Sequence, residues 1–312
     1  MTANTPTQTY DRSQPTRAVD PPATSPGTGP GLGRLLGYAA VALGLTWAVW
    51  IPALMLLDAG AVPFVLLGAF GPAVAAAVMI RTEGGRVRSW LRRILILRLP
   101  ARWYLAALTL PLLEPATVTT VAVVHGEPLA LAELPARLPA VLAGFVVVLL
   151  VGGGQEEFGW RGYLLPRLQA RVGALSASLA VGVLWAVWHL PLFTFGMPGY
   201  TYENVPFLVY LPLLMAASVA FTWLFNHTSG SVVPVMLLHA AFNSWDNLTP
   251  LPASVPLDGQ VEATAQVALV GVYALLAVAL VLTAGRRLGA PPSDRQAPTI
   301  DRPQATSGQS GA

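Results

Sequence analysis

Eight runs of roughly 20 apolar residues fill most of this chain and constrain its fold more than any other feature, because an α-helix needs about that length to cross the bilayer core. Of the 312 residues, 54% are hydrophobic and only 11% are charged. A soluble domain carries about 25% charged residues, so the composition excludes an ordinary soluble protein. The chain is therefore predicted to be an all-α membrane protein, a bundle of eight transmembrane helices. The predicted spans are 35–57, 61–80, 103–124, 138–160, 174–195, 206–226, 230–248 and 263–285.

Arginine placement supports the count of eight. All 18 basic residues are arginine. With eight spans they fall on one side, before the first span, between the second and third, and after the fourth and eighth, with Arg137 as the exception. Cytoplasmic loops carry the excess of positive charge, so both termini are predicted to be cytoplasmic in a multi-pass protein of the cell membrane. The same placement accounts for the basic pI without a nucleic-acid partner.

The two ends of the chain differ in composition from the spans. Residues 1–33 and 288–312 are rich in Pro, Thr, Ser and Gly and cannot form a hydrophobic core, so they are predicted to be disordered cytoplasmic tails. Residues 34–287 then form the eight-helix domain. The alanine-rich, arginine-rich and lysine-free composition favours a bacterial source with a GC-rich genome.

The segment 86–97 carries cationic and apolar residues at near-helical spacing. Such a segment is typical of an amphipathic helix that lies on the cytoplasmic leaflet, with its arginines among the lipid headgroups. A solvated basic loop is the alternative.

Two adjacent carboxylates, Glu156 and Glu157, end the fourth apolar run directly after the glycines 152–154. An ionisable residue within the membrane is costly and is by default a functional candidate. Neighbouring residues of a helix point about 100° apart, so the two carboxylates are predicted to have different roles. Glu157 and Arg161 are spaced i,i+4 and are predicted to pair, which leaves Glu156 for another partner. The glycines permit a kink or a close approach. The alternative is that both carboxylates lie at the membrane interface and pair with arginines.

Two histidines lie on later spans. Glu156 and His189 are about equally far from the turn expected at Gly173, so antiparallel packing of spans four and five would bring them to one depth. His239 and Asn243 are spaced i,i+4 and share one face of the seventh span. Without a functional role, these side chains would be hydrogen-bonded core residues that hold the helices together.

Together these residues resemble the CPBP family of intramembrane proteases, which includes CAAX prenyl protease 2 and bacteriocin-processing enzymes and is also called the Abi family. Three family motifs, E-E-x-x-x-R, F-x-x-x-H and H-x-x-x-N, occur in this order on spans four, five and seven. The matching residues are Glu156, Glu157, Arg161, His189, His239 and Asn243. The second motif has Trp185 where Phe is usual, which keeps an aromatic side chain four residues before the histidine. The layout resembles the family over 35–285, and the motifs lie within 150–245.

The resemblance implies an intramembrane endopeptidase, a hydrolase that cuts a membrane-associated peptide or protein substrate within the lipid bilayer. It implies that Glu156 and His189 position and deprotonate a water molecule, and that His239 and Asn243 donate hydrogen bonds to the oxyanion. The carboxylate and arginine pair of the first motif would support this site. Processing of prenylated CAAX proteins belongs to the eukaryotic branch of the family, so that substrate is not carried over to this chain.

A metalloprotease is the alternative mechanism. Glu156, His189 and His239 would then be the ligands of a zinc ion with water in the open position, because three ligands of the His₂Glu kind suit catalytic zinc. The chain has no cysteine, which excludes a thiolate metal site and a cysteine nucleophile. The sequence leaves both mechanisms open, one without a cofactor and one with zinc, and it carries no signal for an oligomeric state.

Two functions of other classes would use the same residues. A proton-coupled transporter or channel would use Glu114, Glu156, His189 and His239 as relay groups, although the halves of the chain show no inverted repeat. A non-catalytic membrane immunity or scaffold protein would use the fold for binding alone, and its phenotype would survive substitution of Glu156.

Overall fold

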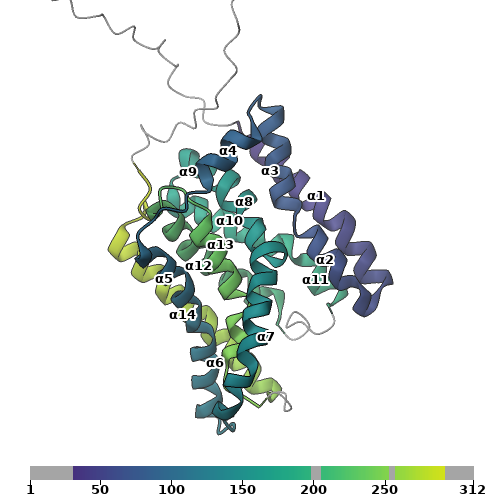
Figure 1. Ribbon diagram of the computed structural model, residues 1–312, viewed down its shortest axis with the longest axis vertical. Helices are drawn as coiled ribbons and strands as arrows, with labels where there is room; N and C mark the ends of the chain where they lie inside the picture. The colour runs from purple at the N-terminus through teal and green to yellow at the C-terminus, as the bar shows by residue number, and fades with distance from the viewer. Residues whose placement is uncertain (1–30, 198–204, 253–256, 292–312) are drawn as a thin grey trace, which may run out of the picture.

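The computed structural model describes residues 31–197, 205–252 and 257–291, and this part of the chain is helical with no β-strand (Figure 1). The predicted all-α fold class is confirmed. The tails predicted at 1–33 and 288–312 fall mostly outside the described residues, and α1 already begins at Leu32. The α-helices are α1 (Leu32–Leu56), α2 (Val62–Gly68), α3 (Gly71–Thr82), α4 (Val87–Ile94), α5 (Ala101–Thr109), α6 (Leu113–Val124), α7 (Leu134–Val147), α8 (Glu157–Gly159), α9 (Leu165–Val172), α10 (Ala174–Trp188), α11 (Leu190–Phe195), α12 (Phe207–His227), α13 (Val233–Phe242) and α14 (Gly259–Ala284).

Seven helical segments of the described chain are long and apolar enough to cross a membrane, which supports a multi-pass membrane protein. The remaining predicted span, 230–248, contains only the short apolar helix α13. This helix ends at Phe242, and the chain continues into a 3₁₀ turn at Trp245–Leu248. The predicted count of eight is therefore approximate. The seven long segments are Leu32–Leu56, Val62–Thr82, Ala101–Val124, Leu131–Val172, Ala174–Phe195, Phe207–His227 and Gly259–Ala284.

The segment Leu131–Val172 is not one regular helix. α7 passes into a π-helical turn at Val148–Gly152 and breaks at Gly153. The chain resumes through a 3₁₀ turn, α8 and a second π-helical turn at Trp160–Leu164 before α9 begins. Turns of this kind change the direction in which successive side chains point and are frequent at functional sites. The kink predicted at the glycines is present, and the carboxylates follow it.

Helices α10 and α12 form the centre of the bundle and are joined by small and polar residues. Ser218 Oγ donates to the Ser178 carbonyl at 2.8 Å. A Cβ at Gly182 would lie 2.7 Å from Met215 Cα, so glycine is required for the helices to approach this closely. Such contacts associate helices in lipid, where burial of apolar surface gives little driving force.

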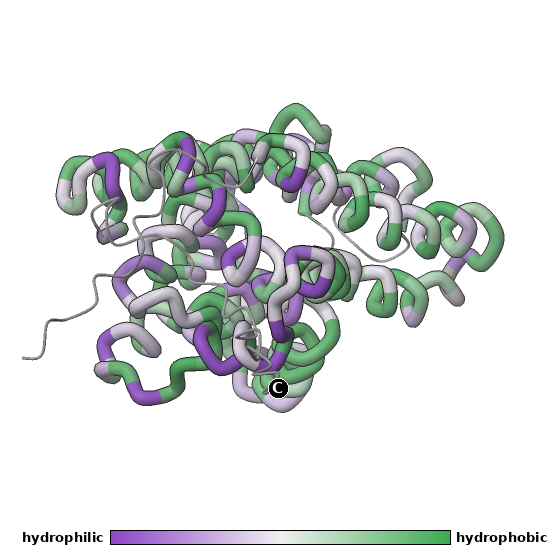
Figure 2. The backbone as a smooth tube through the Cα atoms, turned by 90° about the horizontal axis from the view of Figure 1, so that it is seen from above, coloured by the Kyte–Doolittle hydropathy of each residue, from purple (hydrophilic) through white to green (hydrophobic). Residues whose placement is uncertain are grey.

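The outer surface of the bundle is apolar. Hydrophobic residues colour most of the helical tube in Figure 2, and large side chains such as Leu208 and Leu282 are about four-fifths exposed, at 81% and 80%. An exposed apolar surface of this extent is expected of helices that face lipid.

The arginine-rich connections lie at one end of the bundle, the upper end in Figure 1. Glu83 follows α3 and binds Arg167 of α9 at 2.9 Å. The backbone N–H of Leu175, at the start of α10, donates to the carbonyl of Arg286 after α14. The connections after α3, α9 and α14 are therefore neighbours, as the arginine pattern predicts. That this end faces the cytoplasm stays a prediction.

Arg137, the exception to the arginine pattern, has local partners. It forms an i,i+4 ion pair with Glu133 and donates to the carbonyls of Thr249 and Leu251. The arginine thus ties the start of α7 to the connection between α13 and α14.

The segment 86–97 contains helix α4, so the alternative of a basic loop is wrong. Trp90 and Ile94 are buried, each 6% exposed, whereas Arg88 and Arg92 are exposed. The predicted amphipathic helix is present.

Candidate active site

Glu157 and Arg161 form a buried ion pair. Arg161 Nη1 lies 3.0 Å from both carboxylate oxygens, and both side chains are 0% exposed. Arg161 also donates to Ser218 Oγ at 3.2 Å and lies over the rings of Trp185 and Phe221, at 5.0 and 4.6 Å. A hydroxyl and two aromatic faces thus replace water around the guanidinium. The predicted i,i+4 pair forms, and its supporting role stays a prediction.

His239 shares the same carboxylate. Its Nδ1 lies 2.7 Å from Glu157 Oε1. An ionised carboxylate only accepts hydrogen bonds, so Nδ1 is the donor. This leaves Nε2 with the lone pair in the neutral ring and with a second N–H in the imidazolium. The sequence does not reveal the contact between His239 and Glu157, because the two residues are 82 positions apart.

The break after α7 lies directly against His239 and Asn243. A Cβ added at Gly153 would be 2.8 Å from His239 Nε2 and 3.1 Å from Asn243 Nδ2. Both nitrogens therefore converge on the bare backbone of Gly153, and any side chain there would displace them. The two members of the H-x-x-x-N motif point to one place, as their i,i+4 spacing predicts.

Glu156 forms no part of the ion pair and is held by two indoles. Trp160 Nε1 and Trp185 Nε1 both donate to Glu156 Oε2, each at 3.1 Å. Among the described residues, no hydrogen bond reaches Oε1. Sequence reasoning did not identify the indoles as donors, although Trp185 in place of the usual Phe was a signal for one of them.

His189 contacts the backbone of the same tryptophan, Trp185. Its Nδ1 lies 2.8 Å from the Trp185 carbonyl. A carbonyl only accepts, so Nδ1 donates and Nε2 carries the lone pair of the neutral ring. Glu156 and His189 therefore bind one residue, through its indole and its carbonyl. The ring of His189 also contacts Trp188 and Tyr210, with centroids 4.6 and 5.5 Å apart.

The predicted site residues come together from three helical segments. Glu156 lies close enough to His239 and Glu157 for electrostatic interaction, and so does His189 to His239. In the described part of the chain, however, no three His, Asp or Glu side chains are grouped so that they could hold a metal ion. The ligand set Glu156, His189 and His239 is therefore not assembled in this arrangement, and a zinc mechanism has no geometric support here.

Glu114 lies among residues other than those of the three motifs. It lies on α6, and its Oε2 is buried without a hydrogen bond among the described residues. Its electrostatic neighbours include Asp246 and Tyr273. Its contacts give no support to a relay through Glu156.

Comparison with known proteins agrees with the motifs. Residues 138–245 match the family described as Type II CAAX prenyl endopeptidase Rce1-like, and all six motif residues lie in this range. A CAAX prenyl protease 2 of Methanococcus maripaludis is 30% identical over 101 residues, which make up 31% of this chain and 37% of that protein. The chain thus matches well under half of this relative's length. Residues 138–245 are therefore similar to the CAAX prenyl endopeptidases, the family that the three motifs resemble.

Proposed function

We propose that the chain is an intramembrane endopeptidase, which hydrolyses a peptide bond with a water molecule activated by Glu156 and His189. The arrangement of Glu156 carries the proposal: one carboxylate oxygen is held by two indoles, and the other receives no hydrogen bond from the described residues. A carboxylate fixed in this way is suited to accept a proton from water.

His189 assists at the same water. In this scheme Nδ1 donates to the Trp185 carbonyl, and the Nε2 lone pair of the neutral ring accepts a hydrogen bond from the water. The water oxygen attacks the substrate carbonyl carbon as one of its protons passes to Glu156. When the tetrahedral intermediate collapses, the C–N bond breaks and this proton passes from Glu156 to the leaving amine.

His239 and Asn243 are the oxyanion donors in this scheme. Both side-chain nitrogens converge at Gly153, and the scheme places the substrate carbonyl oxygen within reach of both. Donation from His239 Nε2 requires the imidazolium, and Glu157 supplies the counter-charge on the Nδ1 side. Glu157 in turn is held in place by Arg161, which gives this second carboxylate a positioning role.

The substrate is a membrane-associated peptide or protein whose scissile bond reaches the interior of the bundle. The site residues lie on segments that are long and apolar enough to cross a membrane, or on the short helix α13 between them. A soluble substrate would have to leave water and enter the apolar region around these segments. A peptide attached to the membrane is already concentrated at that region.

Cleavage products in cells test the proposal. Membrane fractions from cells that carry wild type, Glu156→Gln or His189→Ala are compared by mass spectrometry of new protein N-termini. Products that appear with wild type and disappear in both variants support proteolysis and identify the substrate. Glu127→Gln is the matched control, since it removes a carboxylate from a connection that contains no site residue. Products that persist in both site variants, at equal protein levels, would overturn the proposal and favour a binding role.

A further inference from the structure

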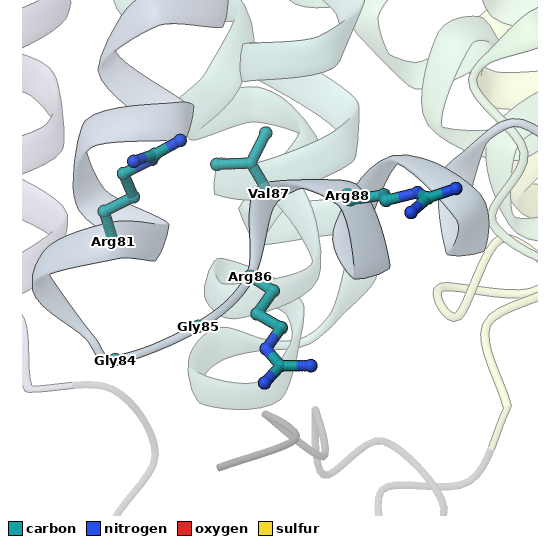
Figure 3. Close-up of a pocket in the computed structure, with 6 residues that line it drawn as sticks. All are labelled: Arg81, Gly84, Gly85, Arg86, Val87 and Arg88. Atoms are coloured by element: carbon teal, nitrogen blue, oxygen red, sulfur yellow. The ribbon is translucent and has the colours of Figure 1, made fainter. Parts of the chain in front are cut away.

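A basic pocket lies where α3 turns into α4. It has a volume of about 520 Å³, and both helices and the two glycines between them contribute to its lining (Figure 3). The lining residues are Arg81, Gly84, Gly85, Arg86, Val87 and Arg88.

The pocket has three arginines and no acidic residue in its lining. Arg81, Arg86 and Arg88 are exposed, and none of them takes part in the ion pairs of the described chain. The acid of this turn, Glu83, is already bound to Arg167 and to the Tyr163 hydroxyl, at 2.9 and 2.7 Å. Guanidinium groups bind phosphate with charge-assisted hydrogen bonds, so three of them at one turn attract phosphate anions. Their side chains point in different directions from the turn (Figure 3).

The position of the pocket selects the kind of phosphate. It follows directly on the apolar segment Val62–Thr82, which is long enough to cross a membrane. The next helix, α4, buries Trp90 and Ile94 and exposes Arg88 and Arg92. The apolar face of α4 packs on the bundle, and its arginines lie next to the end of a segment of membrane length. Lipid headgroups lie at this level, and anionic lipid is the abundant phosphate there.

The two sides of the pocket both form hydrogen bonds with residues 162–167, the segment that follows the carboxylate motif. Trp90 Nε1 of α4 donates to the Gly162 carbonyl at 2.9 Å. On the α3 side, Glu83 holds Tyr163 and Arg167. Gly162 and Tyr163 directly follow Arg161, the partner of Glu157. Lipid headgroups bound on either side of the pocket therefore act on the segment that carries both carboxylates.

We propose that Arg81, Arg86 and Arg88 bind phosphate headgroups of anionic membrane lipids, and that these lipids steady the active-site segment through Glu83 and Trp90. The second part rests on the proposed protease function, and the first part does not.

Lipid retention tests the binding. The full chain is purified in detergent, phosphatidylglycerol or phosphatidylcholine is added, and bound lipid is measured by native mass spectrometry. Wild type is expected to retain phosphatidylglycerol at least about tenfold more strongly than Arg86→Gln/Arg88→Gln, because each arginine adds to the attraction for anionic headgroups. The matched control Arg286→Gln/Arg287→Gln removes the same charge at the same end of the bundle and is expected to bind as wild type.

Three outcomes would overturn the binding site. These are equal retention of phosphatidylglycerol by both double variants, equal retention of phosphatidylcholine by wild type, or displacement of the lipid by millimolar inorganic phosphate. All three are observable whether or not the chain is a protease.

Activity in vesicles tests the coupling. Cleavage of a substrate identified in cells is expected to rise with the phosphatidylglycerol content of the vesicles for wild type and for the Arg286/Arg287 control, and to stay flat for the Arg86/Arg88 variant. Trp90→Phe removes the bond to Gly162 and is expected to keep lipid retention while losing at least about half of the stimulation. A full lipid response in both Trp90→Phe and the Arg86/Arg88 variant would exclude the coupling.

Discussion

His239 Nδ1 donates to Glu157 Oε1 across 2.7 Å, and the same carboxylate binds Arg161. This contact joins the first and third motifs, which are far apart in the chain. It divides the adjacent carboxylates: Glu157 holds a histidine and an arginine, whereas Glu156 is held by indoles and faces the proposed water. In the proposed mechanism, the motif E-E therefore combines a positioning residue with a catalytic one.

Glu157→Gln is expected to lower both stability and activity. The substitution leaves the buried Arg161 without its counter-charge, and breaking a buried ion pair costs about 3–5 kcal/mol. Thermal unfolding in detergent measures the loss. Glu133→Gln provides the control, because its i,i+4 pair with Arg137 is partly exposed and such a pair contributes about 1 kcal/mol or less. Equal stability changes in the two variants would contradict the buried pair's importance.

Trp185→Phe is expected to lower kcat and leave KM unchanged. Phe keeps the ring and restores the residue usual in the family, but it removes one of the two hydrogen bonds to Glu156 Oε2. A hydrogen bond to a charged group is worth about 1.5–3 kcal/mol, which corresponds to a fall of about ten- to a hundredfold in kcat. Steady-state kinetics with a substrate identified in cells provides the measurement.

Trp50→Phe is the matched control for Trp185→Phe. Trp50 is also buried and donates its indole N–H, to the Val65 carbonyl at 2.8 Å. Its loss is expected to lower the unfolding temperature without changing kcat. If Trp185→Phe behaved like this control, the indole would have a structural role only.

Gly153→Ala is expected to reduce cleavage at least about tenfold while the chain still folds. The new Cβ would lie 2.8 Å from His239 Nε2, which forces the proposed oxyanion donors out of position. Gly144→Ala in α7 is the control, because its Cβ would meet nothing within 4 Å. Alanine also favours helix there by up to about 1 kcal/mol. Activity in the Gly153 variant equal to that of the Gly144 variant would refute the convergence of donors at this position.

Exhaustive chelation is expected to leave cleavage unchanged, because the described residues offer no group of three His, Asp or Glu side chains for a metal. Elemental analysis of the purified chain and an activity assay after treatment with a strong chelator provide the test. Stoichiometric zinc together with activity that is lost on chelation and restored by zinc would instead establish the metalloprotease mechanism.

The helical fold class, one buried ion pair and the family resemblance follow from the sequence alone. Apolar runs of membrane length dictate helices, because backbone hydrogen bonds must be made within each segment in lipid. The i,i+4 spacing predicted the Glu157–Arg161 pair, and the glycines before it permitted the break in the long segment. The three motifs indicated the family resemblance over residues 138–245, since their residue types and order are visible without coordinates.

The tertiary structure decided which side chains meet. The predicted span 230–248 became the short helix α13 because the chain leaves the helix at Asn243, which periodicity of apolar residues does not reveal. The bond from Trp185 to Glu156 and the bond from His239 to Glu157 join residues on different helices. Spacing along the sequence fixes neighbours within one helix, whereas contacts between helices depend on how the whole bundle packs.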